Sequence, residues 1–156
     1  MKKILQLCLL VIALTARQAL GVDDITLKLA DAKLLPADGV AAELLGYNDG
    51  EGKIFYYAPG KAEWRIKVVA EGEYTLNVKA SCDAALKENA KFQVSLDGKS
   101  AGDEVSLSAE GEKEYKVTLK LKLGEYKLAI AFTNDAYKAG EYDRNLYIHG
   151  AVLKRN

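Results

Sequence analysis

The residues best suited to chemistry lie in one polar stretch near the carboxyl terminus, residues 132–148. Oxygen-bearing side chains recur along it: Asn134, Asp135, Glu141, Asp143 and Asn145. Gly140 permits a tight backbone path, which lets main-chain carbonyls turn inward. Calcium takes six to eight hard oxygen ligands at about 2.3–2.6 Å, and a stretch rich in carboxylates, amides and carbonyls can supply them. The spacing therefore indicates a candidate Ca²⁺ site, with an ordinary polar turn as the alternative, because turns favour Asp and Asn for their own hydrogen bonds.

Softer metals do not suit this sequence. Zinc prefers nitrogen and sulfur ligands, and His149 is the only histidine. Cys8 and Cys82 are the only cysteines. We expect His149 to be a hydrogen-bonded strand residue and Cys82 to be a small buried apolar residue.

Aromatic side chains accompany the acids. Tyr137 and Tyr142 lie within the polar stretch, and Tyr47 lies in a second polar loop, residues 46–52, that could approach it. Rings of this kind stack against the apolar faces of sugars, although ordinary packing is the alternative for each tyrosine. Trp64 alternates with core positions and is assigned to the interior. Arg144 is expected to pair with a carboxylate and hold the loop in shape.

A pair of carboxylates can also perform acid/base catalysis on glycosidic bonds. Asp135 with Asp143 or Glu141 would be such a pair. The chain is small, however, which leaves little room for a deep substrate cleft, and no nucleophile with its base accompanies the acids. We therefore expect a protein without catalytic activity and keep a secreted glycoside hydrolase or lyase as an alternative.

Period-two alternation dominates the rest of the chain and is typical of strands. The alternating apolar sets are 64/66/68, 74/76/78, 92/94/96, 115/117/119/121, 126/128/130/132 and 146/148, with Val152 as a further member. Gly, Asp and Asn turn signals separate them. Short amphipathic strands between such turns predict an all-β fold, an antiparallel two-sheet β-sandwich. Residues 84–90 favour either one or two helical turns or a long loop.

The amino terminus has the layout of a signal peptide. Lys2 and Lys3 precede an apolar run, residues 4–14, and small residues stand at Ala19 and Gly21. The run is shorter than the roughly 20 residues of a membrane-spanning helix. We expect cleavage after residue 21, a single domain over 22–156, and a soluble secreted or periplasmic product.

Charge narrows the choice of partners. The sequence carries 22 basic and 22 acidic residues, and loss of residues 1–21 would leave 19 basic residues. A mildly acidic protein is a poor partner for nucleic acid or an anionic membrane, which are bound largely through concentrated positive charge. The oligomeric state does not follow from the sequence.

Asn134-Asp135 followed by the run from Asp143 to Ile148, Asp-Arg-Asn-Leu-Tyr-Ile, closely resembles the carboxy-terminal signature of calcium-dependent xylan-binding modules, carbohydrate-binding module families thirty-six and sixty, which are related to family thirty-five. The looser resemblance covers most of residues 38–153. It implies a jelly-roll sandwich with Ca²⁺ at one loop end. It also implies ligands from the side chains of Asp135 and Asp143 and from the main-chain carbonyl of Tyr142. The connection at 138–141 is longer here than in those families, which makes Asp135 either a ligand or a turn residue.

The function implied by the resemblance is calcium-dependent binding of a xylan-type polysaccharide, with two neighbouring sugar hydroxyls completing the coordination of the ion. The sugar-contacting residues expected are Asn134, Tyr137, Tyr142 and Asn145. The alternative is a structural, calcium-stabilised module, either in the cell envelope or secreted, that binds no sugar.

Overall fold

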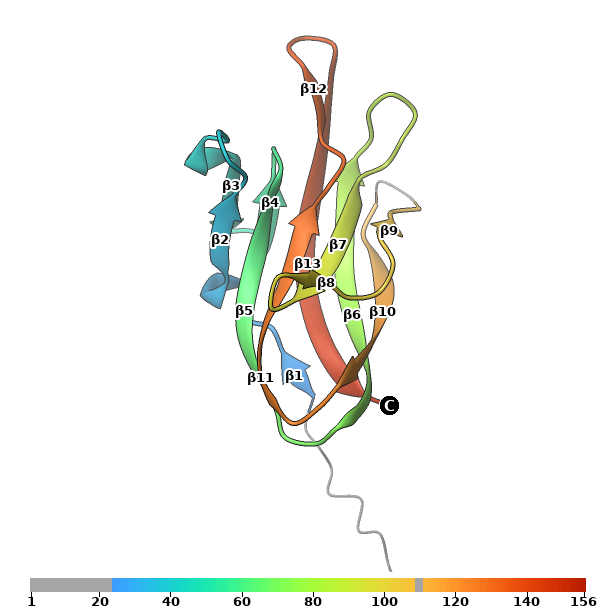
Figure 1. The fold of residues 1–156 in the computed structure, drawn as a ribbon. Coiled ribbons are helices and arrows are strands. Elements are labelled where there is room, and N and C mark those ends of the chain that lie inside the picture. Colours follow the sequence, from blue (N-terminus) through green and yellow to red (C-terminus); the bar gives the residue numbers. More distant parts are fainter. Residues whose placement is uncertain (1–23, 109–110) are drawn as a thin grey trace, which may run out of the picture.

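Two antiparallel sheets face each other in a computed structural model that describes residues 24–108 and 111–156 (Figure 1). The predicted signal peptide, residues 1–21, lies outside the described residues. The seven-stranded sheet contains β1 (Ile25–Thr26), β3 (Leu45–Asn48), β4 (Lys53–Tyr56), β6 (Gly72–Asp83), β10 (Lys113–Leu121), β12 (Ala136–Lys138) and β13 (Tyr142–Arg155). The six-stranded sheet contains β2 (Lys33–Pro36), β5 (Gly60–Val68), β7 (Lys91–Leu96), β8 (Lys99–Ser100), β9 (Val105–Ser106) and β11 (Gly124–Phe132).

Two short 3-10 turns, η1 (Leu29–Asp31) and η2 (Ala42–Leu44), accompany the strands. The all-β, two-sheet sandwich predicted from the alternation is confirmed. Within the described ranges there is no helix long and apolar enough to span a bilayer.

The core lies between the sheets and is filled by the alternating residues. In β5, Trp64, Ile66 and Val68 are buried, and Trp64 donates from Nε1 to the carbonyl oxygen of Lys28 at 2.8 Å. Complete burial of an aliphatic side chain such as Ile66 or Val68 stabilises the fold by roughly 1.5–3 kcal/mol. Cys82 of β6 is buried among them, as expected.

One strand departs from the simple alternation. β13 pairs with β6 along most of its length, but the register shifts between Ile148 and Gly150. A bulge adds one residue and therefore exchanges the faces of the residues that follow. Ala151 and Leu153 are buried as a result, whereas Val152, which the alternation assigned to the core set, is only half-buried.

Residues 84–90 form a loop and not a helix. Leu86 and Lys87 both have positive φ, 55° and 61°, and Ala85 and Glu88 exchange backbone hydrogen bonds around them. Two successive left-handed residues close a tight turn and cannot continue a right-handed helix. The helical alternative for this segment is therefore wrong.

Candidate metal and carbohydrate site

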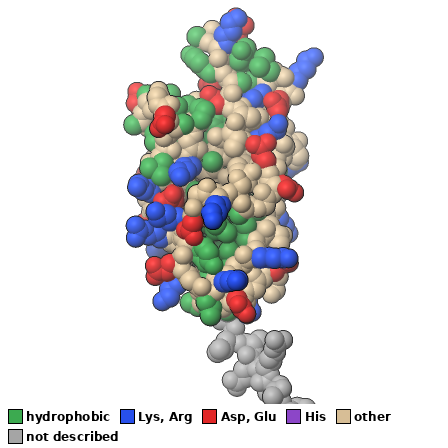
Figure 2. Space-filling model, viewed as in Figure 1, with side chains coloured by type: hydrophobic (Ala, Val, Ile, Leu, Met, Phe, Trp, Pro, Cys, Tyr) green, Lys and Arg blue, Asp and Glu red, His purple; other side chains and the backbone are tan. Residues whose placement is uncertain are grey.

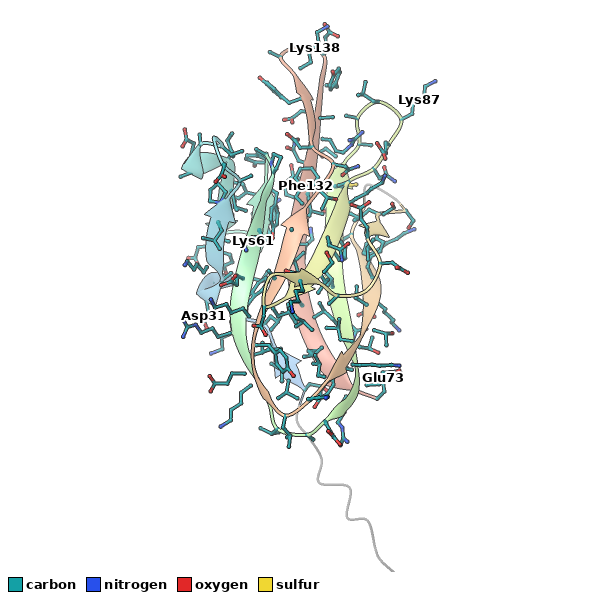
Figure 3. All side chains as sticks on the ribbon, viewed as in Figure 1. Asp31, Lys61, Glu73, Lys87, Phe132 and Lys138 are labelled. Atoms are coloured by element: carbon teal, nitrogen blue, oxygen red, sulfur yellow. The ribbon has the colours of Figure 1, made fainter. Side chains whose placement is uncertain are left out.

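The polar stretch forms a hairpin that projects beyond one end of the sandwich (Figure 1). β12 pairs with the start of β13 in the register Ala136 to Arg144 and Tyr137 to Asp143. At its tip Gly140 has φ of +74°, and Glu141 donates its backbone N–H to the carbonyl of Lys138 at 2.9 Å. Figure 3 shows Lys138 at this tip, with Lys87 at the same end of the molecule and Glu73 at the opposite end.

Asp135 and Asp143 face one cavity of about 660 Å³ at the base of this hairpin. Tyr137 lines the same cavity, because it stands opposite Asp143 and so shares a face with it. The remaining lining comes from Gly39–Ala41, Leu44 and Tyr57–Pro59. The cavity therefore lies between the hairpin and the segments flanking η2, and Figure 2 shows hydrophobic side chains gathered at this end.

The surroundings of Asp135 disfavour the charged form of its carboxyl group. Burial raises the pKa of its carboxyl group, and the negative charge of Asp143 adds to the shift, while the Ala136 backbone N–H and Arg144 oppose it. Its Oδ1 atom is buried and has no hydrogen-bond partner among residues 24–108 and 111–156. Such an oxygen costs about 1–3 kcal/mol unless something satisfies it. A small cation between the two carboxylates would remove both the repulsion and the missing contact.

Asn145 contains a second buried oxygen of this kind. Its side chain is 6% exposed, and within the described part of the chain its Oδ1 has no hydrogen-bond partner. Its Nδ2 donates to Oδ2 of Asp83 in the neighbouring strand β6 at 3.0 Å. Asn145 and Asp143 are two residues apart in β13 and so point to the same face. An amide oxygen hidden in this way is a better ligand for a small ion than for a sugar hydroxyl.

The other predicted residues have different surroundings. Asn134 uses both ends of its amide to connect loops: Oδ1 accepts from the backbone N–H of Lys91 at 2.7 Å, and Nδ2 donates to the carbonyl of Asn89 at 3.0 Å. The Tyr142 side chain is half-buried beside Lys138 and does not line the cavity. Tyr137 is 65% exposed and is free to stack.

The second polar loop does not reach the cavity. Tyr47 belongs to β3 and packs against the core, while Oδ1 of Asn48 accepts the backbone N–H of Glu51 within its own turn. The aromatic residue that does join Tyr137 is Tyr57, just after β4. The sequence contains no local signal for Tyr57 or for Asp83, because both approach the site only through sheet pairing.

Arg144 fixes the base of the hairpin. It is 3% exposed, and its guanidinium donates to the carbonyls of Glu88 at 3.0 Å, Asn134 at 2.5 Å and Ala85 at 2.5 Å. Its Nη2 also lies 3.4 Å from the Glu88 carboxylate. The expectation that Arg144 pairs with a carboxylate and holds the loop agrees with these contacts.

The donor set suits a hard cation but is incomplete. Across residues 24–108 and 111–156, no three or more His, Cys, Asp or Glu side chains are grouped closely enough to hold a metal ion. Calcium needs six to eight oxygens, so two carboxylates must be supplemented by amide, carbonyl, water or ligand oxygens. The oxygen chemistry fits calcium, and His149 is engaged elsewhere, 2.7 Å from Ser81 Oγ and 3.3 Å from Glu112.

Comparison with known proteins agrees with this architecture. The family described as a Ca-dependent, xylan-binding carbohydrate-binding module, CBM60, matches residues 75–155, and the chain belongs to that family. No curated protein matches the chain. A CBM36 module solved in complex with calcium and xylotriose superimposes with a TM-score of 0.61 at 12% identity, covering 86% of this chain and 100% of that one.

Two further solved structures share the fold. The CBM36-1 domain of a multidomain xylanase from the hindgut metagenome of Trinervitermes trinervoides has a TM-score of 0.60 at 11% identity, covering 86% of this chain and 98% of that one. The Podospora anserina GH26-CBM35 β-(1,4)-mannanase has a TM-score of 0.58 at 18% identity. The match covers 85% of this chain but only 28% of the mannanase.

Proposed function

We propose that this carbohydrate-binding module binds a xylan-type polysaccharide through a calcium ion held at the base of the β12–β13 hairpin. The observation that carries the proposal is the buried Oδ1 of Asp135, which no described residue satisfies, beside Asp143 in a cavity lined by tyrosines. The family description and the neighbour solved with calcium and xylotriose support the same choice of ion and sugar.

The residues that would hold the ion are Asp135, Asp143 and, through Oδ1, Asn145, with the main-chain carbonyl of Tyr142 as a further donor. Calcium takes six to eight oxygens, so two neighbouring sugar hydroxyls would complete the coordination that these residues begin. Tyr137 and Tyr57 supply apolar faces on which a pyranose ring can stack. Arg144 positions the hairpin without touching the sugar.

The decisive experiment is affinity electrophoresis in gels containing soluble xylan, with calcium or with a chelator. We expect migration to be retarded by xylan only when calcium is present, and Asp143→Asn to abolish the retardation. Glu141→Gln is the matched control, because Glu141 is exposed and pairs with Lys138 at the hairpin tip. Retardation that is equal with and without calcium would refute the role of the ion.

The alternative is a structural calcium module. The buried Oδ1 atoms of Asp135 and Asn145 favour an ion but do not require a sugar. A melting temperature that rises with calcium, in a protein that binds no glycan, would therefore favour this second function. A glycan array probed with and without calcium separates the two functions and also tests glycans other than xylan.

We also infer that the protein acts outside the cytoplasm. The support is the cationic, then apolar, amino-terminal sequence with small residues at Ala19 and Gly21. Amino-terminal sequencing of the protein recovered from the periplasm and from the culture medium tests this localisation. A protein that keeps residues 1–21 and stays in the cytoplasm would contradict it.

A further inference from the structure

Three aromatic rings lie together on the outer face of the seven-stranded sheet. Phe55 and Tyr57 project from β4 and its end, with ring centroids 4.6 Å apart and planes 29° apart. Tyr147 of β13 meets Tyr57 edge to face at 6.2 Å. Outward positions of a solvated sheet are ordinarily polar, so neighbouring rings at such positions indicate a surface that is used.

The rings are fixed before any partner arrives. The Tyr147 hydroxyl donates to Oδ2 of Asp83 at 2.6 Å, and the Lys53 ammonium lies 4.5 Å from the centre of the Tyr147 ring. Phe55 lies over Gly46 in β3, where a Cβ atom would overlap the ring. A surface held in this way loses little conformational entropy on binding.

This aromatic surface is continuous with the cavity under the hairpin. Tyr57 belongs to both, because it lines the cavity that holds Asp135 and Asp143. Asn145 and Asp83 form a polar edge between the carboxylates and the rings.

We propose that a linear, neutral polysaccharide leaves the cavity over Tyr57 and continues across Tyr147 and Phe55, so that the module grips an internal stretch of several sugar units and not a chain end. This inference rests on the proposed function at the hairpin. It commits to a neutral glycan for two reasons. Asp83 lies outside the proposed ligand set and would repel an anionic polymer, and the nearby cation, Lys53, is neutralised by Glu51 at 2.5 Å.

The occupant is a sugar chain and not the apolar face of another protein. The three rings form a small cluster, in which Phe55 and Tyr147 are cross-strand partners and Tyr57 contacts both. Lys53 and Asp83 border the cluster, and both keep polar partners. A protein interface buries its apolar centre within a much wider contact area. A pyranose chain needs only flat rings beneath it and hydrogen-bonding groups at its edge.

The test is titration calorimetry of the full chain, in calcium, with xylobiose and with xylohexaose. For the parent protein we expect xylohexaose to bind at least about tenfold more tightly than xylobiose. Removing one stacked ring should reduce this ratio about fivefold, since a ring contact is worth roughly 1 kcal/mol and 1.4 kcal/mol corresponds to a factor of ten. The variants are Tyr147→Val and Phe55→Leu, and the second does not touch the hydrogen bond to Asp83.

Lys127→Gln is the control, because Lys127 is exposed on the six-stranded sheet and should leave the ratio unchanged. A ratio that is the same in the parent and in both ring variants would overturn the inference while leaving calcium-dependent binding of xylobiose intact. Failure of both oligosaccharides to bind in calcium would overturn this inference together with the proposed function.

Discussion

The Arg144 guanidinium donates from Nε to the Glu88 carbonyl at 3.0 Å while one of its Nη atoms lies 3.4 Å from the Glu88 carboxylate. This double contact joins the hairpin that carries the candidate ligands to the loop formed by residues 84–90. A buried cation with three carbonyl acceptors is well compensated, and its removal leaves those acceptors without donors.

Arg144→Lys should therefore destabilise the protein by about 2–4 kcal/mol, because one ammonium cannot reach carbonyls in three directions. Urea unfolding followed by Trp64 fluorescence measures the change. Lys138→Gln, at an exposed ion pair on the hairpin tip, is the control and should cost less than about 0.5 kcal/mol. Equal effects of the two substitutions would argue against Arg144 as the anchor of the hairpin.

Asp135→Asn should change stability in opposite directions without and with calcium. In chelator the variant should be slightly more stable, by less than about 1 kcal/mol, because it removes a partly buried charge beside Asp143 whose repulsion is screened by solvent. In calcium at about 100 times the dissociation constant the parent gains about 2.7 kcal/mol, and the variant loses most of that gain. Urea unfolding under both conditions measures the crossover, and a variant that is less stable in chelator would contradict it.

Tyr137→Ala should weaken xylan binding without destabilising the fold. The side chain is 65% exposed, so its removal changes little core packing. Loss of one stacking ring should raise the dissociation constant about fivefold. Calorimetry with xylohexaose and thermal melts of the same sample measure the two effects. An unchanged dissociation constant would show that Tyr137 does not contact the sugar.

His149 should make the protein less stable in mild acid. Burial lowers its pKa below the ordinary value, although Glu112 opposes the shift, with Lys53, Lys79 and Glu51 also facing the ring. The unfolded chain therefore binds the proton more readily than the folded chain. The free energy of unfolding is highest above about pH 6.5, the pKa of an unfolded histidine, and it falls as the pH drops through the lower pKa of the folded state.

The free energy of unfolding, measured in urea from pH 7.5 to pH 5, should therefore decrease. His149→Asn should flatten this slope. The pKa of Glu112 is lowered from its ordinary acidic value, so its own loss of stability occurs at more acidic pH. A slope that is unchanged in His149→Asn would assign the pH dependence to other groups.

The alternation of the sequence determined the strands and the sandwich. A side chain points to one face or the other according to its position along the strand, and this property is local. The run from Asn134 to Ile148 likewise revealed the hairpin acids and the family, because ligand types and their spacing are written in one continuous segment.

Tertiary structure alone decided what surrounds those acids. Tyr57 and Asp83 reach the hairpin through pairing with strands far away in the chain, and the bulge after Ile148 moves Leu153 into the core in place of Val152. The turn at residues 84–90 is held by Arg144 from β13. Register and long-range hydrogen bonds set these neighbours, and no local period encodes them.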